Sequence, residues 1–373
     1  WHGIRGARYD RMFGEGFFPH AYRRLGPCAD HLHHAGDWGE WTNTRSDDGK
    51  GAHDRFGGGH SHCGLMIYRG DNWPAEYRGR AFLCNTHGRR VNSERLEVQG
   101  SGYVARHEDD FLRANNAWFK GVEMVYGPDG GVYLSDWCDY GECHDSDGVH
   151  RSSGRIYKIT YGKPNEIPPR LRDLNKLDSM QLAALQTHPN AFFATHARRI
   201  LQERSAIAGE GIDEDTVSRL WAIATTADST EHRINALWAL HCTGSLGRAQ
   251  HARLRADNED AIVAWSLARE FPSQSDLLKL IAAGGTTPKI RLAIATGLTQ
   301  LKPAERFRVV EDLAQFEEDA DDANLPLMLW YAIEPIVPSH AEQALALARG
   351  SKLALLTEFI ARRLAHEDRH LPT

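Results

Sequence analysis

The sequence predicts a protein with an all-β part followed by an all-α part. Its composition changes sharply along the chain, because residues 1–162 contain 26 of the 34 glycines, 12 of the 20 histidines and 6 of the 10 tryptophans. Strand-like runs and tight turns fill this first part, whereas apolar residues recur at helical spacing in the second. The proline-rich stretch YGKPNEIPPR separates the two. We therefore expect a β part at 1–162, a linker at 163–175 and an α part at 176–373.

Short strands and frequent turns make up the β part. In residues 121–137 an apolar run precedes Pro128-Asp129-Gly130, and an alternating run follows it. Pro fixes φ and Gly tolerates a positive φ, so these residues predict a turn between two strands. A turn roughly every 8–12 residues is typical of a β-sandwich or a β-propeller. Further strands are expected at 64–70, in 79–98 (two strands with a turn near His87 and Gly88) and at 153–162, and a long surface loop at 26–59.

Pairs of helices make up the α part. Asp178 and Gln181 have the spacing of a capping box at the start of the first helix. Four similar apolar segments, HARRILQ, HRINALWAL, AIVAWSLA and KIRLAIATGL, begin at residues 196, 232, 261 and 289. A recurring unit of this kind is typical of an α-solenoid, and because the units are shorter than the usual period of about 40–47 residues we describe them as HEAT-like. An irregular helical bundle is the alternative.

Charge and hydropathy exclude some classes of protein. The 373-residue chain has a formal net charge of -6 and a pI of about 6.4, which argues against a general nucleic-acid binder. No run of eighteen apolar residues occurs, so no membrane span is expected here. The sequence begins at Trp1 rather than Met, and we expect a fragment from which a signal or anchor is missing. The six cysteines form no C-x-x-C motif, and a disulfide between Cys28 and Cys63 is predicted.

The densest polar segment directly follows a predicted strand, at residues 136–151. Loops at strand ends are common positions for catalytic groups, and carboxylates suit calcium. An EF-hand is rejected because the glutamate at its twelfth loop position is absent. The alternative is a hydrated acidic loop whose aspartates bond to the local backbone. The candidate metal ligands are Asp136, Asp139, Glu142, His144, Asp145 and Asp147, and Asp136 is also a catalytic candidate.

Histidines and basic residues form two further candidate groups. His60 and His62 would point to one face of a strand and so supply a base or metal ligands, although loop histidines bonded to the backbone are the simpler interpretation. His87, Arg89 and Arg90 would hold an anionic group, because guanidinium pairs with carboxylates. A charged hairpin turn is the alternative. His60, His62 and His87 are therefore the other catalytic candidates.

Tryptophans and one arginine are candidates for holding a sugar. Aromatic rings can stack on sugar rings, although packing in the core or in loops is the more common role of tryptophan. The candidate substrate-binding residues are Trp73, Trp118, Trp137 and Arg151. In the α part an acidic run at 317–322 precedes an apolar helix, where we expect a solvated cap; a solenoid could also bind a protein partner there.

Three long motifs resemble one known family. They begin HSHCGLMIYRGDNWP at residue 60, WFKGVEMVYGPDGG at residue 118 and DADDANLPLMLWY at residue 319. Together they are similar to the large planctomycete-type membrane-bound dehydrogenases, whose first domain resembles the glucose/sorbosone dehydrogenase β-propeller. HEAT-like repeats follow it, and often a c-type cytochrome module. The resemblance implies that 1–162 are the last blades of a propeller, that 176–373 are the repeats, and that this fragment holds no haem.

The resemblance also implies a cofactor. In characterised relatives pyrroloquinoline quinone lies over the propeller axis, an early-blade histidine is the general base, and basic residues on late blades hold the quinone carboxylates. The early-blade histidine would precede Trp1. Where relatives have a lysine this chain has His87, and where they have two arginines before the GPDG turn it has only Lys120. The implied cofactor-binding residues are thus His87, Arg89, Arg90 and Lys120.

From these residues and the resemblance we expect one of two functions, which belong to different classes. The first is a periplasmic or cell-envelope oxidoreductase that acts on the CH–OH groups of sugars or alcohols and passes electrons to a c-type cytochrome. The second is a non-catalytic module whose propeller binds polysaccharide and whose solenoid binds a protein. A hydrolase using paired carboxylates such as Asp136 and Glu142 is weaker, because the separation that acid–base catalysis requires is not encoded in the sequence.

Overall fold

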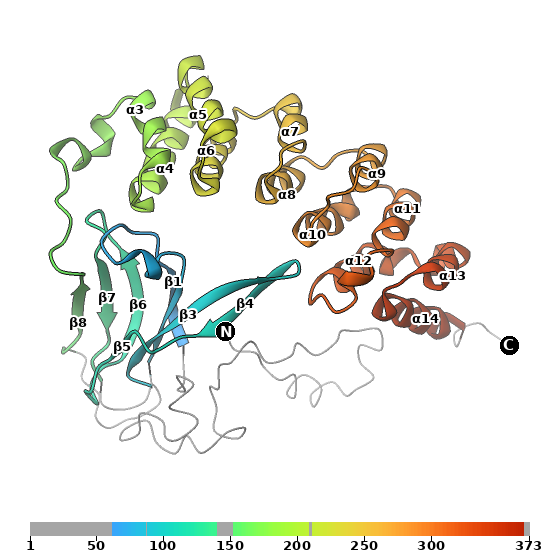
Figure 1. Ribbon diagram of the computed structural model, residues 1–373, viewed down its shortest axis with the longest axis horizontal. Coiled ribbons are helices and arrows are strands. Elements are labelled where there is room, and N and C mark those ends of the chain that lie inside the picture. Colours follow the sequence, from blue (N-terminus) through green and yellow to red (C-terminus); the bar gives the residue numbers. More distant parts are fainter. Residues whose placement is uncertain (1–61, 87, 140–151, 209–210, 369–373) are drawn as a thin grey trace. The chain divides into compact units, whose positions relative to one another are not determined.

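The computed structural model describes residues 62–86, 88–139, 152–208 and 211–368 (Figure 1). As predicted, a β-rich region precedes a helical region. Within these residues the strands are β1 (His62–Ile67), β2 (Ala81–Asn85), β3 (Arg90–Gln99), β4 (Gly102–His107), β5 (Leu112–Arg113), β6 (Gly121–Tyr126), β7 (Val132–Asp136) and β8 (Arg155–Ile159). The helices are α3 (Ser179–Ala184), α4 (Ala191–Ala208), α5 (Glu214–Thr226), α6 (Thr230–Cys242), α7 (Arg248–Leu254), α8 (Asp260–Arg269), α9 (Gln274–Ala282), α10 (Pro288–Gly297), α11 (Pro303–Leu313), α12 (Leu325–Ile333), α13 (Ala341–Gly350) and α14 (Ala354–Asp368).

Internal contacts divide the chain into two compact units. Of the described residues, the first unit holds those of 62–97 and 104–245, and the second holds 98–103 and 246–368. The first unit therefore contains most of the strands together with helices α3–α6. These two units are defined by their internal contacts, whereas the predicted linker at 163–175 marks the change from strands to helices. The predicted domain boundaries stay predictions.

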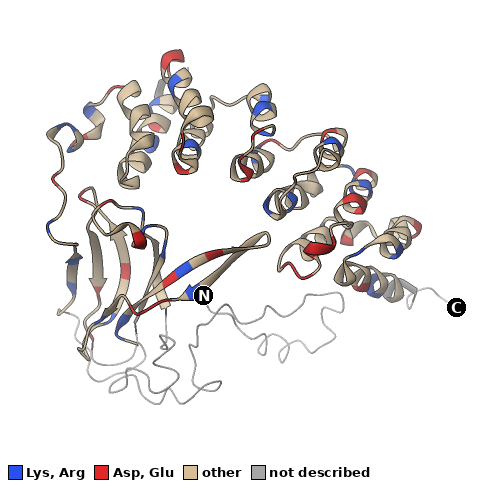
Figure 2. Ribbon diagram, viewed as in Figure 1, with Lys and Arg blue, Asp and Glu red and all other residues tan. Residues whose placement is uncertain are grey.

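The first sheet is antiparallel, with the strand order β1-β2-β3-β4, and β5 pairs with β3. The two strands predicted within 79–98 are confirmed as β2 and β3, whose register places Leu83 opposite Asn92. On the β3–β4 hairpin Arg95 forms ion pairs with Glu97 and Glu108, and Arg106 with Glu97. Figure 2 shows residues of both charges along this hairpin.

The second sheet has the order β6-β7-β8 and is also antiparallel. The predicted turn between β6 and β7 is confirmed: the N–H of Gly127 donates to the carbonyl of Gly131 at 2.8 Å, and Gly130 has a φ of +74°. The Asp129 carboxylate accepts the N–H of Gly131 within this turn. The sequence Pro-Asp-Gly thus forms the turn by the mechanism expected of it.

The two sheets pack on each other through one apolar core. Met66, Phe82, Met124 and Leu134 are buried there, each at most 5% exposed. Strand β1 approaches β6 closely, because a Cβ atom added to Gly64 would lie 2.5 Å from the carbonyl oxygen of Val122. Burial of large apolar side chains is the main stabilising contribution to such packing.

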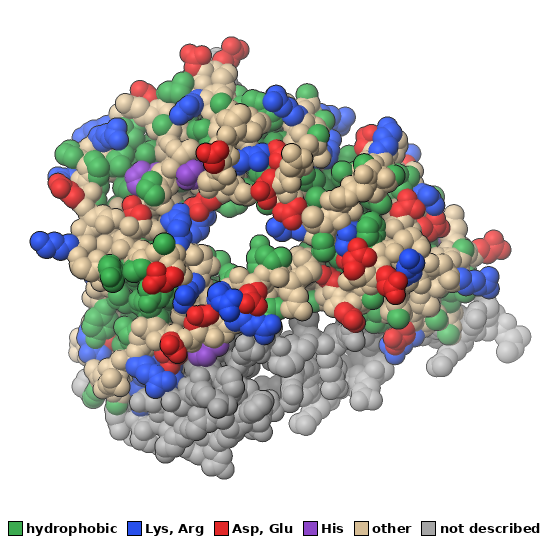
Figure 3. Space-filling view, viewed as in Figure 1, with side chains coloured by type: hydrophobic (Ala, Val, Ile, Leu, Met, Phe, Trp, Pro, Cys, Tyr) green, Lys and Arg blue, Asp and Glu red, His purple; other side chains and the backbone are tan. Residues whose placement is uncertain are grey.

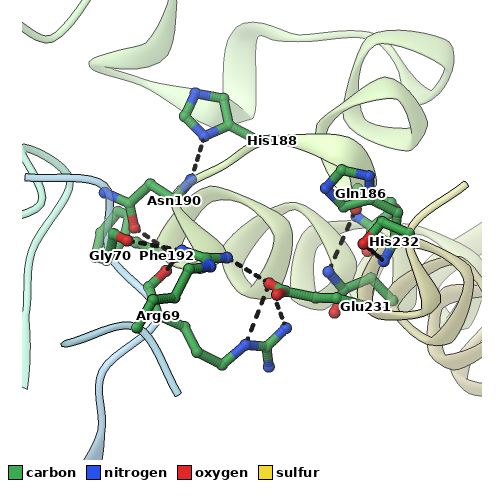
Figure 4. Close-up of polar contacts among 11 residues, drawn as sticks. Arg69, Gly70, Gln186, His188, Asn190, Phe192, Glu231 and His232 are labelled. Carbon is green, nitrogen blue, oxygen red and sulfur yellow. Dashed lines mark hydrogen bonds and ion pairs between the residues drawn. The ribbon is translucent and has the colours of Figure 1, made fainter. Parts of the chain in front are cut away.

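Polar contacts join the sheets to helices α4 and α6 within the first unit (Figure 4). Arg69 donates to the Glu231 carboxylate from Nη2 at 2.8 Å, and Arg78 donates to the same oxygen at 2.6 Å. Asn190, which precedes α4, donates from Nδ2 to the carbonyl of Gly127 at 3.0 Å. The predicted capping box at the start of α3 is confirmed, because Asp178 and Gln181 exchange hydrogen bonds.

In the second unit, alternate helices pack side by side. Helices α8, α10, α12 and α14 contact one another in sequence, and so do α9, α11 and α13 (Figure 1). The helical segments predicted from residues 261 and 289 are confirmed as α8 and α10. Figure 3 shows acidic and basic side chains interspersed over these helices. Among the described residues, no helix is both long and apolar enough to cross a membrane.

The acidic run before α12 is only partly solvated. Asp319 is 3% exposed and accepts hydrogen bonds from Nε and Nη2 of Arg291, each at 2.6 Å. The expectation of a solvated cap is therefore wrong at this residue. A bidentate guanidinium–carboxylate pair satisfies the donors and acceptors that burial removes from water.

Asp322 holds two segments of the second unit together. Its carboxylate accepts the N–H and the hydroxyl of Ser101, both at 2.7 Å, and the N–H groups of Asn324 and Leu325, both at 2.9 Å. Burial alone would raise the pKa of Asp322, but these hydrogen bonds outweigh burial and lower the pKa. A lowered pKa in the folded state means that the ionised form stabilises the fold.

We expect Asp322→Asn to change the acid sensitivity of the protein. The contribution of Asp322 is fully present above the unfolded-state pKa of about 4 and is lost as pH falls through the lower folded-state pKa. The variant should therefore lose about 1–2 kcal/mol of unfolding free energy at pH 7 and show a flatter decline below about pH 4. Urea unfolding between pH 7 and pH 2.5 measures both effects. The exposed neighbour Asp321→Asn is the control, and equal acid slopes in wild type and Asp322→Asn would contradict the prediction.

Candidate functional site

The ends of strands β2, β6 and β7 bring several predicted site residues together. The N–H of Lys120, just before β6, donates to Oδ1 of Asp136 at the end of β7, at 2.8 Å. Thr86, at the end of β2, donates its hydroxyl to the carbonyl of Gly121 at 2.8 Å. The β2–β3 turn that carries Arg89 therefore lies beside Lys120 and Asp136. These contacts lie within the first unit.

Asp136 is the polar centre of this site. It is 3% exposed, and its carboxylate also accepts the N–H of Cys138 at 2.8 Å and a hydrogen bond from Nε of Arg155 at 2.9 Å. Nη2 of Arg155 completes an ion pair with the same carboxylate at 2.7 Å. Strand register fixes the last contact, because Asp136 lies opposite Arg155 in the β7–β8 pair. Cys138 has a φ of +56°, a conformation uncommon for a residue with a side chain. The carboxylate thus helps to hold the backbone in the conformation that ends β7.

These bonds leave Asp136 poorly suited to a cation. Both carboxylate oxygens accept hydrogen bonds, and the Arg155 guanidinium places a positive charge beside them. Asp139 is 5% exposed, and the other predicted ligands, Glu142, His144, Asp145 and Asp147, lie outside the described residues. No group of three or more potential metal ligands occurs among the residues that the structure describes. The calcium site stays a prediction that rests on the segment beyond Asp139.

Asp136→Asn is expected to destabilise the first unit moderately. The variant keeps the shape of the side chain but places an amide where Arg155 requires a charged acceptor, so we expect a loss of about 1–2 kcal/mol of unfolding free energy. Chemical denaturation at pH 7 measures this loss. Glu123→Gln on the neighbouring strand is an exposed control, and an Asp136→Asn variant as stable as that control would show that the Arg155 pair contributes nothing.

The basic candidates are buried. Arg90 is 1% exposed and donates from Nη1 to Oδ2 of Asp110 at 2.8 Å and from Nε to the carbonyl of Gly88 at 3.0 Å. Lys120 is 1% exposed, and Arg89, with a φ of +55°, is 5% exposed. A quinone with several carboxylates needs cations that reach an opening. These three side chains form no open cationic cluster and do not fit such a cofactor as arranged here; His87 lies outside the described residues.

The histidine pair can be placed only in part. His62 begins β1, opposite Asn85 of β2, and His60 lies outside the described residues. The register places His62 at the same end of the first sheet as Thr86, next to the β2–β3 turn. The structure therefore brings His62 to the strand ends that carry the other candidates, and its expected role as a base or ligand stays a prediction.

The three tryptophans lie in different environments. Trp73 is a core residue, 6% exposed, with its ring stacked on Tyr68 at a centroid distance of 4.4 Å and on Phe111 at 4.6 Å. Its faces are thus occupied by protein. Trp118 is half-buried, and Trp137 is 47% exposed just after β7. Of the described candidates, Trp118 and Trp137 remain placed to meet a ligand, and Arg151 lies outside the described residues.

A cleft of about 270 Å³ opens beside this site. Leu134 and Tyr157 form part of its wall, and they lie opposite each other two residues along β7–β8 from the Asp136–Arg155 pair. Arg113, Asn116 and Phe119 line the other side. Arg113, Asn116 and Tyr157 are not among the site residues predicted from the sequence. The alternation of β8, which puts Tyr157 on the same face as Arg155, is the signal that could have found Tyr157.

The fold and this site define a β-then-α protein with a polar cluster at the ends of antiparallel strands. Comparison with protein families finds that residues 39–163 match a family described as "Domain of unknown function (DUF7133)". The matched range includes β1–β8 and the whole candidate site. A search of curated proteins and a search of solved structures found no match.

Proposed function

We propose that the chain is part of a cell-envelope oxidoreductase that oxidises a CH–OH group of a sugar or alcohol and passes the electrons to a c-type cytochrome. The class comes from the family resemblance of the three long motifs. The observation that supports it most is the convergence of Lys120, Asp136 and the turn of Arg89 beside a cleft. Rigid strand ends of this kind are common positions for reactive groups.

We propose further that the sheets are propeller blades and the helices HEAT-like repeats. Two antiparallel sheets with short connections pack face to face through a shared core, as neighbouring blades do. In each unit, helices two apart in the chain contact one another, as in a stacked solenoid. The solenoid is then the part of the chain that would bind a protein partner.

The cleft suits a small polyhydroxylated substrate. Phe119 and Tyr157 supply aromatic surface, while Arg113 and Asn116 supply hydrogen-bond donors. An apolar cleft with a few polar groups is the usual form of a small-molecule site. The Asp136–Arg155 pair fixes the wall beside Tyr157 and so holds the cleft in shape. The resemblance implies a quinone and the acidic segment implies calcium, although the buried Arg89, Arg90 and Lys120 do not fit the quinone as arranged here.

A dye-linked assay tests the proposal. The full protein is mixed with an electron-accepting dye and a panel of aldoses and alcohols, with and without added pyrroloquinoline quinone and calcium. Reduction of the dye is expected with at least one substrate, and Asn116→Ala should reduce kcat/KM by about tenfold or more. Arg95→Ala, on the exposed face of β3, is the matched control. No dye reduction under any of these conditions would overturn the proposal.

A non-catalytic glycan-binding module is the second candidate. It is favoured by the burial of Arg90 and Lys120, which removes two cations from contact with a cofactor, and by the exposed Trp137. An exposed indole provides a flat surface for a sugar ring. Binding on a glycan array that Trp137→Ala abolishes, without turnover of any bound sugar, would favour this candidate over the oxidoreductase.

A further inference from the structure

Two cysteines lie opposite each other in the first sheet. Cys63 of β1 and Cys84 of β2 are direct register partners in an antiparallel pair. Side chains of opposite residues point to the same face of a sheet, with Cβ atoms about 4.5–5.5 Å apart. A disulfide requires a Cβ separation of about 3.5–4.5 Å, which a small local adjustment can supply.

The surroundings of both sulfur atoms agree with this register. The Cys63 thiol lies 3.8 Å from the carbonyl oxygen of Gly121 and 3.2 Å from the hydroxyl of Thr86. A Cβ atom added to the same Gly121 would lie 3.2 Å from Sγ of Cys84. Both sulfurs therefore approach one residue of β6, where the first sheet packs on the second.

The two thiols differ in their exposure to solvent, and both have a raised pKa. Cys84 is fully buried, whereas Cys63 is half-buried. Burial raises the pKa of Cys63, and burial with the nearby Cys63 raises the pKa of Cys84 further. Because the thiolate is the reactive form and Cys63 is the more exposed of the two, we expect Cys63 to react first and faster as pH rises.

We propose that Cys63 and Cys84 form a cross-strand disulfide when the protein meets an oxidising disulfide, such as oxidised glutathione or the active-site disulfide of an oxidase. The Cys63 thiolate attacks the disulfide RSSR, and one RS⁻ leaves, so that Cys63 carries a mixed disulfide. The Cys84 thiolate then attacks the Cys63 sulfur and displaces the second RS⁻. The two thiol protons end on the two RSH products, and the two electrons lost by the cysteines reduce RSSR.

This bond would close β1 to β2 at the place where both contact β6. It differs from the Cys28–Cys63 pair that the sequence predicts. The structure gives Cys63 and Cys84 as free thiols, and Cys28 lies outside the described residues. The inference is independent of the proposed oxidoreductase activity, since it concerns the redox state of the sheet itself.

Mass spectrometry tests the proposal directly. The reduced full chain is incubated with oxidised glutathione at pH 8.5, blocked with N-ethylmaleimide under denaturing conditions and digested with trypsin without reduction. Tryptic peptides 56–69 and 81–89 carry one of the two cysteines each, and they are expected as a joined pair. In Cys84→Ala, glutathione should instead remain on Cys63, and Cys242→Ser is the control that should still form the bond.

Thermal unfolding provides a second readout. The oxidised wild type is expected to melt about 5 °C above its reduced form, and this difference should vanish in Cys84→Ala. A wild type that stops at glutathionylated Cys63 with Cys84 still alkylated would overturn the proposal. So would a digest in which Cys63 is joined only to Cys28.

Discussion

Replacing Arg90 with alanine is expected to lower the free energy of unfolding by about 3–5 kcal/mol. Arg90 and Asp110 are paired at 2.8 Å, with side chains 1% and 4% exposed. The change removes the buried cation beside the Asp110 carboxylate, which keeps the Asn92 amide at 2.8 Å and the half-exposed Arg113 at 3.1 Å, and it removes the donor to the Gly88 carbonyl. A buried carboxylate that loses its buried partner costs more than a lost surface contact. Guanidinium-induced unfolding followed by tryptophan fluorescence measures the loss.

The control for Arg90 is Arg95→Ala in the same strand. Arg95 pairs with Glu97 and Glu108 at the surface, with its side chain 52% exposed, and its removal should change stability by less than about 1 kcal/mol. A double variant, Arg90→Met with Asp110→Leu, should recover much of the loss, because it removes both charges together. If Arg90→Ala were no more destabilising than Arg95→Ala, the buried pair would not be what holds the β2–β3 turn.

Gly64→Ala is expected to cost about 3–4 kcal/mol and to loosen the packing of the two sheets. Gly64 has a φ of +58°, and the added Cβ would lie 2.5 Å from the Val122 carbonyl and 2.7 Å from Cα of Glu123. Both neighbours are backbone atoms, so no side-chain rotation can relieve the overlap. Strand β1 must therefore move away from β6, and denaturant unfolding reports the cost.

Gly79→Ala separates the backbone strain of a positive φ from the overlap of the added Cβ with β6. Gly79 also has a positive φ, +84°, but a Cβ there would meet nothing within 4 Å. Its substitution should cost only the backbone strain of about 1–2 kcal/mol. Equal losses at the two glycines would show that the contact between β1 and β6 is not tight.

The elements with strong apolar patterns could be predicted from the sequence. The hairpin 121–137 and the helices that begin at Asp260 and Pro288 combine apolar periodicity with a turn or a cap. Strand β4 was not predicted, because its residues are almost all half-buried and it lacks the contrast between an apolar and a polar face. Its pairing with β3 is supported by cross-strand charges such as Arg95 with Glu108, which become neighbours only once the register is set.

The sequence indicated some residues of the candidate site, but it did not indicate the residues that pair with them. The sequence indicated Lys120 and Asp136, and the structure brings them together. It did not indicate Arg155 or Asp110, since each meets its partner through strand pairing rather than through proximity in the chain. Trp73 was proposed to hold a sugar, but the stacking of Tyr68 and Phe111 on its ring depends on tertiary packing and has no signature in the local sequence.

The contacts of Asn190 and Glu231 with the sheets have a consequence for biosynthesis. Arg69, Arg78 and the carbonyl of Gly127 receive their partners from residues that the ribosome adds 63 to 162 positions later. The contacts of Arg69 and Arg78, in the connection between β1 and β2, can therefore form only once Glu231 of α6 has been synthesised. Because domains tend to fold as units during synthesis, we expect the first unit to complete its packing only after Ser245, its last residue, has been synthesised.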